Sequence, residues 1–277
     1  MNTKPYGLKL FSFEIMMLLA ALIFLTPFYF VIANSFKGFS ELLMNTSSLP
    51  KSLNWENYAR AWEVLSFPRA LRNSFLITVF SDICMVIISS MAAYRLLRHP
   101  SKGNRFLFAM FIAAMVVPFQ TIMIPLVKVG NWLNLLNSMP GIVFFYTGLG
   151  ASFTIFLYHG FMKSIPLEIE EAALIDGCNP YGIFWRIVFP LLKPMTVTVI
   201  VLQSLWMWND FLLPLLVLQK PELQTIQVAM NSLFGQYMQQ WDLALAALVM
   251  GIMPILVFFL ALQRYIIQGI TAGAVKG

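Results

Sequence analysis

Long, uninterrupted apolar blocks are the feature of this sequence that most limits its fold. Each block is about twenty residues long, which is the length that a helix needs to cross the hydrocarbon core of a bilayer. The blocks are continuous, whereas the strands of a membrane barrel alternate between lipid-facing and interior residues. Six such blocks predict six membrane-spanning helices, at residues 13–34, 71–93, 106–129, 140–162, 194–218 and 242–262.

Composition agrees with this interpretation. Apolar residues make up 59% of the 277-residue chain and charged residues 11%, whereas roughly a quarter of the residues in soluble domains are charged. The sequence therefore predicts an all-α, multi-pass integral membrane protein, surrounded by membrane lipid and organised as one domain over residues 1–277. Prolines inside the spans mark expected kinks at Pro27, Pro118, Pro125, Pro214 and Pro254.

Basic residues set the expected orientation, because loops rich in lysine and arginine stay on the cytoplasmic side of a membrane. Eleven of the eighteen basic residues fall in the N-terminal leader, in the connections after the second and fourth spans, and in the tail. The first loop between spans mixes basic and acidic residues, and a long loop of mixed charge weighs less in this rule. Both termini and the loop at residues 163–193 are therefore predicted to lie on the cytoplasmic side. The protein itself is predicted to lie in the cell membrane.

Catalytic motifs are absent from the sequence. No G-x-x-x-x-G-K-[ST] phosphate loop occurs, so the chain is not expected to hydrolyse ATP or to be an enzyme. His99 and His159 have no metal-binding spacing with cysteine or acid. The net charge of +6 comes without the basic, aromatic-lined patch of a nucleic-acid binder. We expect no metal, cofactor or nucleic acid on this chain, so uphill transport would draw on an ion gradient or a partner ATPase.

The loop at residues 163–193 is polar at its start and lies between two apolar spans. It opens with a concentration of acids, which favour the first turn of a helix. Gly177 suits the end of that helix, and Asn179 followed by Pro180 suits the start of a second one. A short helix–turn–helix of this kind is suited to docking in a partner's groove, although a solvated connection would show the same local pattern. The acids are Glu168, Glu170, Glu171 and Asp176.

The spacing in this loop resembles the EAA signature of ABC importer permeases. The run EAALIDG at residues 171–177 is followed after nine residues by IVFP at residues 187–190. Phe189 departs from the family pattern, which has leucine there. The resemblance implies a coupling helix that sits in a cleft of a cytoplasmic ATPase subunit. Its residues would be Glu171, Ala172, Ala173, Asp176 and Gly177.

Two further segments are similar to the MalG-type permeases of carbohydrate ABC importers. They are the run WNDFLLPLLVL in the fifth span and the ending QRYIIQGITAGAVKG, and the similarity extends from the first span to the terminus. The resemblance implies the MetI-like fold of type I ABC importer permeases, with both termini inside. It also implies import of an oligosaccharide of the multiple-sugar, raffinose-like or maltodextrin type. The expected partners are a second, MalF-type permease, two ATPase subunits that use ATP and Mg, and an external sugar-binding protein.

The tail at residues 263–277 would, by the same resemblance, reach the ATPase near its nucleotide site. Three glycines in its last nine residues argue against a strand or a helix there. The tail residues expected to contact the ATPase are Gly269, Thr271, Gly273 and Lys276.

Polar side chains inside the apolar spans are costly in lipid and usually face a cavity or a partner. Gln203, Trp206 and Asp210 are spaced to share one helix face, with Asn209 at its border. Aromatic planes beside amide and carboxylate acceptors suit sugars, whose C–H faces are ringed by hydroxyls. These four residues and Gln120 are candidate pathway or substrate residues, and hydrogen bonding between helices is the alternative role. The resemblance to MalG-type permeases implies that the partner permease holds most of the sugar.

A secondary carrier is the second class of function that the residues allow. In that case Asp82 or Asp210 would be a proton-linked site. This hypothesis explains the acids inside the membrane but leaves the EAA-like loop and the tail without a role.

Overall fold

The structure is a computed structural model that describes residues 8–234 and 240–274. The described residues form helices joined by turns and bends, and no strand occurs among them. The chain divides into two compact units: Met1–Phe67 with Met230–Ile252, and Pro68–Ala229 with Met253–Gly277. The all-α prediction is confirmed for this part of the chain, whereas the single-domain organisation stays a prediction.

The first unit begins with α1 (Leu8–Ser35), an apolar helix whose surface is largely exposed. Two short helices follow, α2 (Phe39–Met44) and α3 (Glu56–Val64). Hydrogen bonds from buried polar side chains stabilise the loop that carries these two helices. The ammonium group of Lys37 donates to the Asn45 carbonyl at 2.9 Å, and the Asn57 amide donates to the carbonyls of Ser35 and Lys37 at 2.9 and 2.8 Å.

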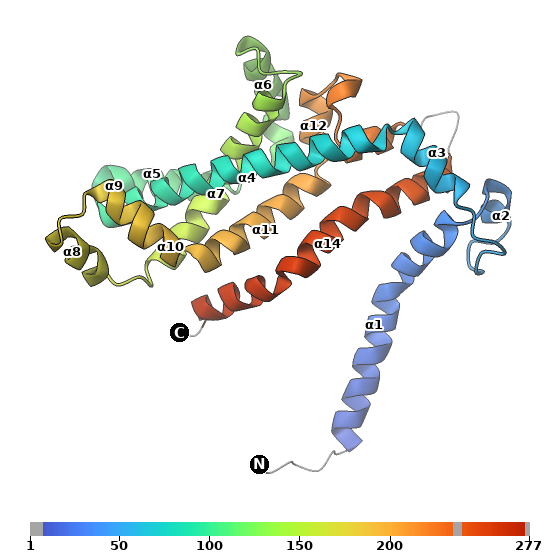
Figure 1. The fold of residues 1–277 in the computed structure, drawn as a ribbon, viewed down its shortest axis with the longest axis horizontal. Coiled ribbons are helices and arrows are strands. Elements are labelled where there is room, and N and C mark those ends of the chain that lie inside the picture. The colour runs from blue at the N-terminus through green and yellow to red at the C-terminus, as the bar shows by residue number, and fades with distance from the viewer. Residues whose placement is uncertain (1–7, 235–239, 275–277) are drawn as a thin grey trace. The chain divides into compact units, whose positions relative to one another are not determined.

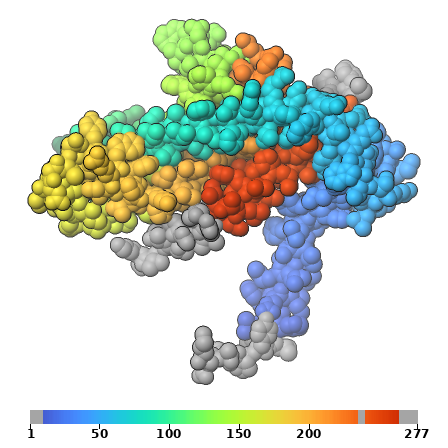
Figure 2. Space-filling view, viewed as in Figure 1, coloured from blue at the N-terminus to red at the C-terminus, as the bar shows by residue number. Residues whose placement is uncertain are grey.

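The second unit contains the long α4 (Phe67–Arg98, which starts at the last residue of the first unit) and α7 (Met139–Met162), with the broken pair α5 and α6 between them. Figure 1 shows α8 and α9 together at the end of this unit where α4 finishes, and Figure 2 shows the same segment, in yellow, forming that end of the surface. The elements in chain order after α4 are α5 (Lys102–Ala114), α6 (Phe119–Trp132), α7, α8 (Glu168–Ile175), α9 (Pro180–Ile183), the π-helix η1 (Phe184–Val188), α10 (Phe189–Leu191), α11 (Lys193–Asn209), α12 (Leu212–Val217), the 3-10 helix η2 (Pro221–Leu223), α13 (Ile226–Asn231) and α14 (Trp241–Ala274).

The structure has between four and six helical spans that are apolar enough to cross a membrane, and six were predicted. Within residues 8–234 and 240–274, four continuous helical stretches are long and apolar enough to cross a membrane: α1, α4, α7 and the Trp241–Gln263 part of α14. Two bent pairs complete six spans if each is counted once. One pair is α5 with α6, and the other is Pro180–Leu191 with α11.

The third span was predicted over residues 106–129 with a kink at Pro118, and the structure bends there so strongly that the helix is interrupted. The helix ends at Ala114 and resumes at Phe119 after a bend of 108°. Pro118 stands at the break in an extended conformation, with φ −63° and ψ 136°. Proline supplies no N–H for a helical hydrogen bond and disfavours a helical residue before it, which explains the break.

Two other boundaries differ from expectation. In the fifth span, α11 ends at Asn209 and α12 begins at Leu212, so the span predicted over residues 194–218 is interrupted. The tail was expected to be neither strand nor helix, yet α14 continues to Ala274. Glycine lowers helix stability by only about 1 kcal/mol per residue, which a long helix that is already nucleated tolerates.

The core of the second unit lies where α4, α7 and α11 meet. Glycine allows these helices to approach closely, because a Cβ atom at Gly150 of α7 would collide with the Met85 sulfur of α4 and lie 3.4 Å from the Gln203 amide of α11. A second close approach supports the turn before α7, where a Cβ atom at Gly141 would collide with the Leu135 carbonyl oxygen. Close packing of this kind through small residues is typical of helices in membranes.

Candidate functional site

The loop between α7 and α11 folds as its local chemistry predicts. α8 ends in a left-handed glycine, Gly177, with φ +84°. The N–H of Gly177 donates to the Leu174 carbonyl and that of Cys178 to the Ala173 carbonyl, both at 3.0 Å. This pair of bonds is the Schellman motif, which satisfies carbonyls that the end of a helix leaves free. The predicted helix end at Gly177 is confirmed.

The second helix of the loop also starts as predicted. The side-chain oxygen of Asn179 accepts from the N–H of Gly182 at 2.7 Å, and Pro180 is the first helical residue. The helix then widens into η1 before Pro190, and the segment Pro180–Leu191 meets α11 at a bend of 72°. Pro190 and Pro194 each lack an N–H, so neither can complete a continuous helical ladder here.

α8 has two faces with different surroundings. Two of its eight residues are buried, Glu170 and Ala173, which lie three apart on one side. The remaining six are exposed, and Ile175 is 86% exposed. The predicted coupling residues therefore have different surroundings. Ala173 is buried against the core. The other four are exposed on the surface of the loop: Glu171, Ala172, Asp176 and Gly177.

An ion pair that sequence analysis missed holds the inner face of α8. Arg98, at the end of α4, donates from Nε to Oε1 of Glu170 at 2.7 Å, and its Nη2 forms an ion pair with the same oxygen, also at 2.7 Å. Nη2 also donates to the Ile165 carbonyl at 3.0 Å. The Tyr94 hydroxyl donates to the other carboxylate oxygen of Glu170 at 2.7 Å. The acid-rich sequence gave no sign of which acid would turn inward.

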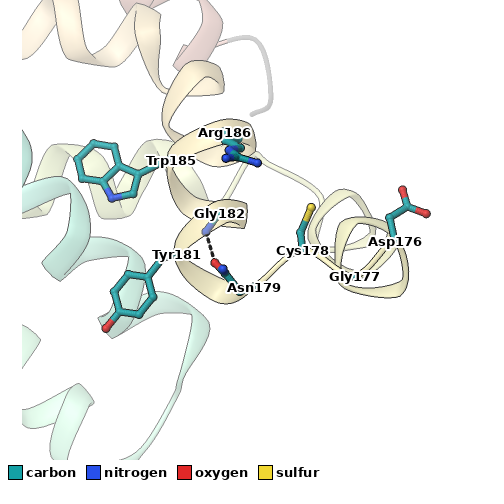
Figure 3. Close-up of a pocket in the computed structure, with 8 residues that line it drawn as sticks. All are labelled: Asp176, Gly177, Cys178, Asn179, Tyr181, Gly182, Trp185 and Arg186. Carbon is teal, nitrogen blue, oxygen red and sulfur yellow. Dashed lines mark hydrogen bonds between the residues drawn. The ribbon is translucent and has the colours of Figure 1, made fainter.

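A shallow pocket of about 410 Å³ opens on the turn between α8 and α9. Figure 3 shows Tyr181 and Trp185 on the side opposite Asp176, with the Cys178 sulfur between the turn and Arg186. The surface therefore offers an acid, a base and two aromatic rings within one short segment. Its lining is completed by Gly177, Asn179 and Gly182.

The polar residues of the fifth span are not on one helix face as predicted, because α11 ends before Asp210. Three of them nevertheless contact α7. The Gln203 amide is buried and donates to the Gly150 carbonyl at 3.3 Å and to the Thr154 hydroxyl at 2.8 Å. Gln203 therefore bonds two helices together, which was the alternative role given to it.

Trp206 and Asp210 meet around one buried tyrosine of α7. The ring of Tyr146 packs edge-on against Trp206 with centroids 5.4 Å apart, and its hydroxyl donates to Asp210 at 3.0 Å. Trp206 is 40% exposed, so one part of the indole is fixed and the other is open. Asn209 is exposed and donates to the Leu205 carbonyl, and Gln120 is exposed on α6.

Asp82 is a buried acid in the middle of α4. The Ser204 hydroxyl of α11 donates to one carboxylate oxygen at 2.6 Å. The other oxygen is buried and accepts no hydrogen bond from the described residues. In the same part of the chain, no three histidine, cysteine, aspartate or glutamate side chains group in a way that would hold a metal ion.

The predicted tail residues are placed only in part. Gly269, Thr271 and Gly273 lie in the final turns of α14, and Lys276 lies outside the described residues.

The sequence matches the family of binding-protein-dependent transport system inner membrane components over residues 85–272. The chain belongs to this family. Such an inner membrane component is a multi-pass membrane protein, in agreement with the apolar helices. A solved bacterial ABC transporter involved in the import of the acidic polysaccharide alginate contains a chain of the same fold, with a TM-score of 0.79, 23% identity, and coverage of 96% of this chain and 99% of that one. The predicted fold of type I importer permeases is thereby confirmed.

Curated relatives of this inner membrane component align over almost their full length. The "Probable starch degradation products transport system permease protein AmyC" of Thermoanaerobacterium thermosulfurigenes is 45% identical over 92% of this chain and 93% of its own. The melibiose/raffinose/stachyose import permease protein MelC of Bacillus subtilis is 38% identical, over 96% and 98%. The multiple sugar-binding transport system permease protein MsmG of Streptococcus mutans is 33% identical, over 99% of each.

Proposed function

We propose that this inner membrane component is the permease subunit of an ATP-driven ABC importer that brings an oligosaccharide into the cell. The observation that carries the proposal is the loop at residues 163–193, where a capped helix presents six exposed residues at one end of the membrane helices α7 and α11. The substrate class is supported by relatives named for starch degradation products, for melibiose, raffinose and stachyose, and for multiple sugars.

The loop would connect this subunit to a partner that hydrolyses ATP. Glu171 and Ala172 lie on the exposed face of α8, and Asp176 and Gly177 form its exposed end, so they are available to a cleft in an ATPase subunit. Ala173 would support this contact indirectly. Its small, buried side chain lets α8 pack close to the core, so that the opposite face of α8 stays exposed to the ATPase. ATP and Mg would bind the ATPase subunits, and this chain would take no catalytic part.

The complete importer would contain a second permease of the MalF type, two ATPase subunits and an external sugar-binding protein. The end of α14, with Gly269, Thr271 and Gly273, and the tail residue Lys276 would extend toward an ATPase subunit. By the resemblance to MalG-type permeases, this tail would reach the ATPase near its nucleotide site.

The sugar pathway would pass the open side of Trp206. The Tyr146 ring packs against the indole of Trp206 and its hydroxyl bonds Asp210, so the exposed part of the indole offers a fixed apolar plane near a carboxylate. Asn209, three residues after Trp206 in the same helix, is exposed and adds an amide. A sugar can stack its C–H face on such a plane while its hydroxyls bond the polar groups. Gln120 is exposed and is retained as a candidate, whereas Gln203 acts between helices.

Orientation of the loop is the direct test of this proposal. In a variant whose two native cysteines, Cys84 and Cys178, are replaced by serine, a membrane-impermeant maleimide should label Trp55→Cys in intact cells. It should label Asn179→Cys only after the membrane is permeabilised, as it should the control Lys102→Cys. Labelling of Asn179→Cys in intact cells would place the loop outside, where no ATPase is available, and would refute the proposal.

A further inference from the structure

We propose that Arg98 is the positioning residue that ties the coupling helix α8 to α4, so that displacement of α8 by the ATPase is passed into the membrane along α4. The inference rests on the proposed function and assigns to Arg98, with Glu170 and Tyr94 as its partners, a role that neither the EAA-like spacing nor the family match gives it.

The attachment of α8 depends on very few side chains. Glu170 and Ala173 are its two buried residues. The side chain of Ala173 is a methyl group. It sets how closely α8 packs against the core, but it makes no directional bond that could transmit a displacement. Glu170 carries the directional bonds, and both of the side-chain donors described above, Nε of Arg98 and the hydroxyl of Tyr94, come from the last turns of α4, as does the ion pair from Nη2 of Arg98.

The electrostatics of the pair suit a permanent connection. Arg98 lies in the last turn of α4 and Glu170 in the first turn of α8, so each charge is at the helix end whose dipole favours it. The two side chains are 14% and 7% exposed, and both carboxylate oxygens are bonded. Removing one partner would leave the other charge buried without compensation, which is costly.

The main-chain connections from α8 to the membrane helices α7 and α11 are less direct than the Arg98–Glu170 ion pair. On one side, α8 is separated from α7 by the non-helical residues 163–167, and on the other by the turn at Gly177 and the 72° bend before α11. α4, in contrast, is one helix from Phe67 to Arg98. It meets α11 in the membrane through the Asp82–Ser204 bond. α4 can therefore carry a displacement of α8 to α11 as a rigid element.

Tyr94 broadens the same contact. Its ring packs against Phe184 of η1 with centroids 5.1 Å apart, while its hydroxyl bonds Glu170. The last turns of α4 thus touch the start of α8, the carbonyl of Ile165 before it, and the π-helix after it. A displacement of any of these three parts of the loop would therefore act on the end of α4.

A double-mutant cycle on the complete complex tests the proposal. The complex of both permeases and the ATPase would be reconstituted with its binding protein, with radiolabelled maltotriose and raffinose as separate probes. In Arg98→Met and in Glu170→Gln, uptake and sugar-stimulated ATP hydrolysis per assembled complex should each fall about tenfold. The double variant should fall by the same factor, because one connection is lost in all three proteins. Arg98→Lys keeps the charge and should lose about threefold.

Arg95→Met is the matched control for Arg98→Met, since Arg95 is an exposed basic residue in the same last turn of α4, and it should behave as wild type. If the variants reduce only the amount of assembled complex and leave the rate per complex unchanged, the pair is purely structural and the inference is wrong. Fold-losses that multiply in the double variant would also overturn it, because Arg98 would then act independently of Glu170. A wild-type complex that takes up neither sugar and whose ATPase neither sugar stimulates would instead contradict the proposed function.

Discussion

Replacing Gly177 with proline should abolish uptake while leaving the complex assembled in the membrane. Gly177 has φ +84°, and its N–H donates to Leu174. Proline fixes φ near −65° and has no N–H, so the Schellman motif cannot form. The turn sits on the surface of the second unit, where its loss would redirect the exposed face of α8 without opening the core.

A graded series separates conformation from side-chain bulk at this position. Nothing lies within 4 Å of a Cβ atom placed at Gly177, so only the backbone conformation limits substitution. Gly177→Asn should keep most activity, because asparagine tolerates a left-handed conformation, and Gly177→Ala should be intermediate. Uptake and the amount of co-purified ATPase are the measurements. Normal uptake with proline would show that the end of α8 is not needed for coupling.

Replacing Trp206 with alanine should raise the sugar concentration needed for half-maximal uptake about tenfold, which corresponds to roughly 1.4 kcal/mol of lost contact. The indole is held by the Tyr146 ring, so the substitution removes a fixed platform rather than a mobile side chain. The maximal rate should change little, because the loop and its connection to α4 are untouched. Initial uptake rates over a range of sugar concentrations measure both quantities.

Trp132→Ala is the control for loss of an exposed tryptophan. Trp132 ends α6 and is 80% exposed. It should leave the concentration dependence unchanged, and Trp206→Phe should lose less than alanine because a ring remains. If Trp206→Ala instead reduces co-purification of the second permease with unchanged uptake per complex, the indole faces the partner rather than the sugar.

Features that depend on neighbouring residues were predictable from the sequence. The apolar blocks gave the spans, and Gly177 and Asn179 gave the helix end and the helix start in the loop, because capping acts over three or four residues. A kink at Pro118 was expected, but a bend large enough to interrupt the helix was not. The same residue type stays within a continuous helix at Pro27 and at Pro254, so a proline alone does not say whether a helix bends or breaks.

Features that depend on distant residues were not predictable. Glu170 and Arg98 are 72 positions apart, and three other acids stand within six residues of Glu170. Only the packing of α8 shows which acid turns inward. Gln203 and Trp206 were grouped by helical spacing, but they contact different residues of α7. The Gln203 amide bonds Gly150 and Thr154, whereas the Trp206 ring packs against Tyr146.

The buried acid Asp82 keeps the secondary carrier as the competing hypothesis. Asp82 has a buried carboxylate oxygen that accepts no hydrogen bond from the described residues, and a transported proton could bind to it. Its other oxygen, however, accepts from Ser204 and joins α4 to α11. That bond gives Asp82 a structural role in an ATP-driven importer, which needs no proton pathway.

The source of energy decides between these two hypotheses. Membrane vesicles that contain the complete complex, its binding protein and internal ATP would be given radiolabelled maltotriose or raffinose, with and without an uncoupler that collapses the proton gradient. The ATP-driven importer should accumulate sugar at the same rate in both conditions and should stop when ATP is removed. Uptake that stops with the uncoupler despite ample ATP would contradict the account and favour a proton-linked carrier.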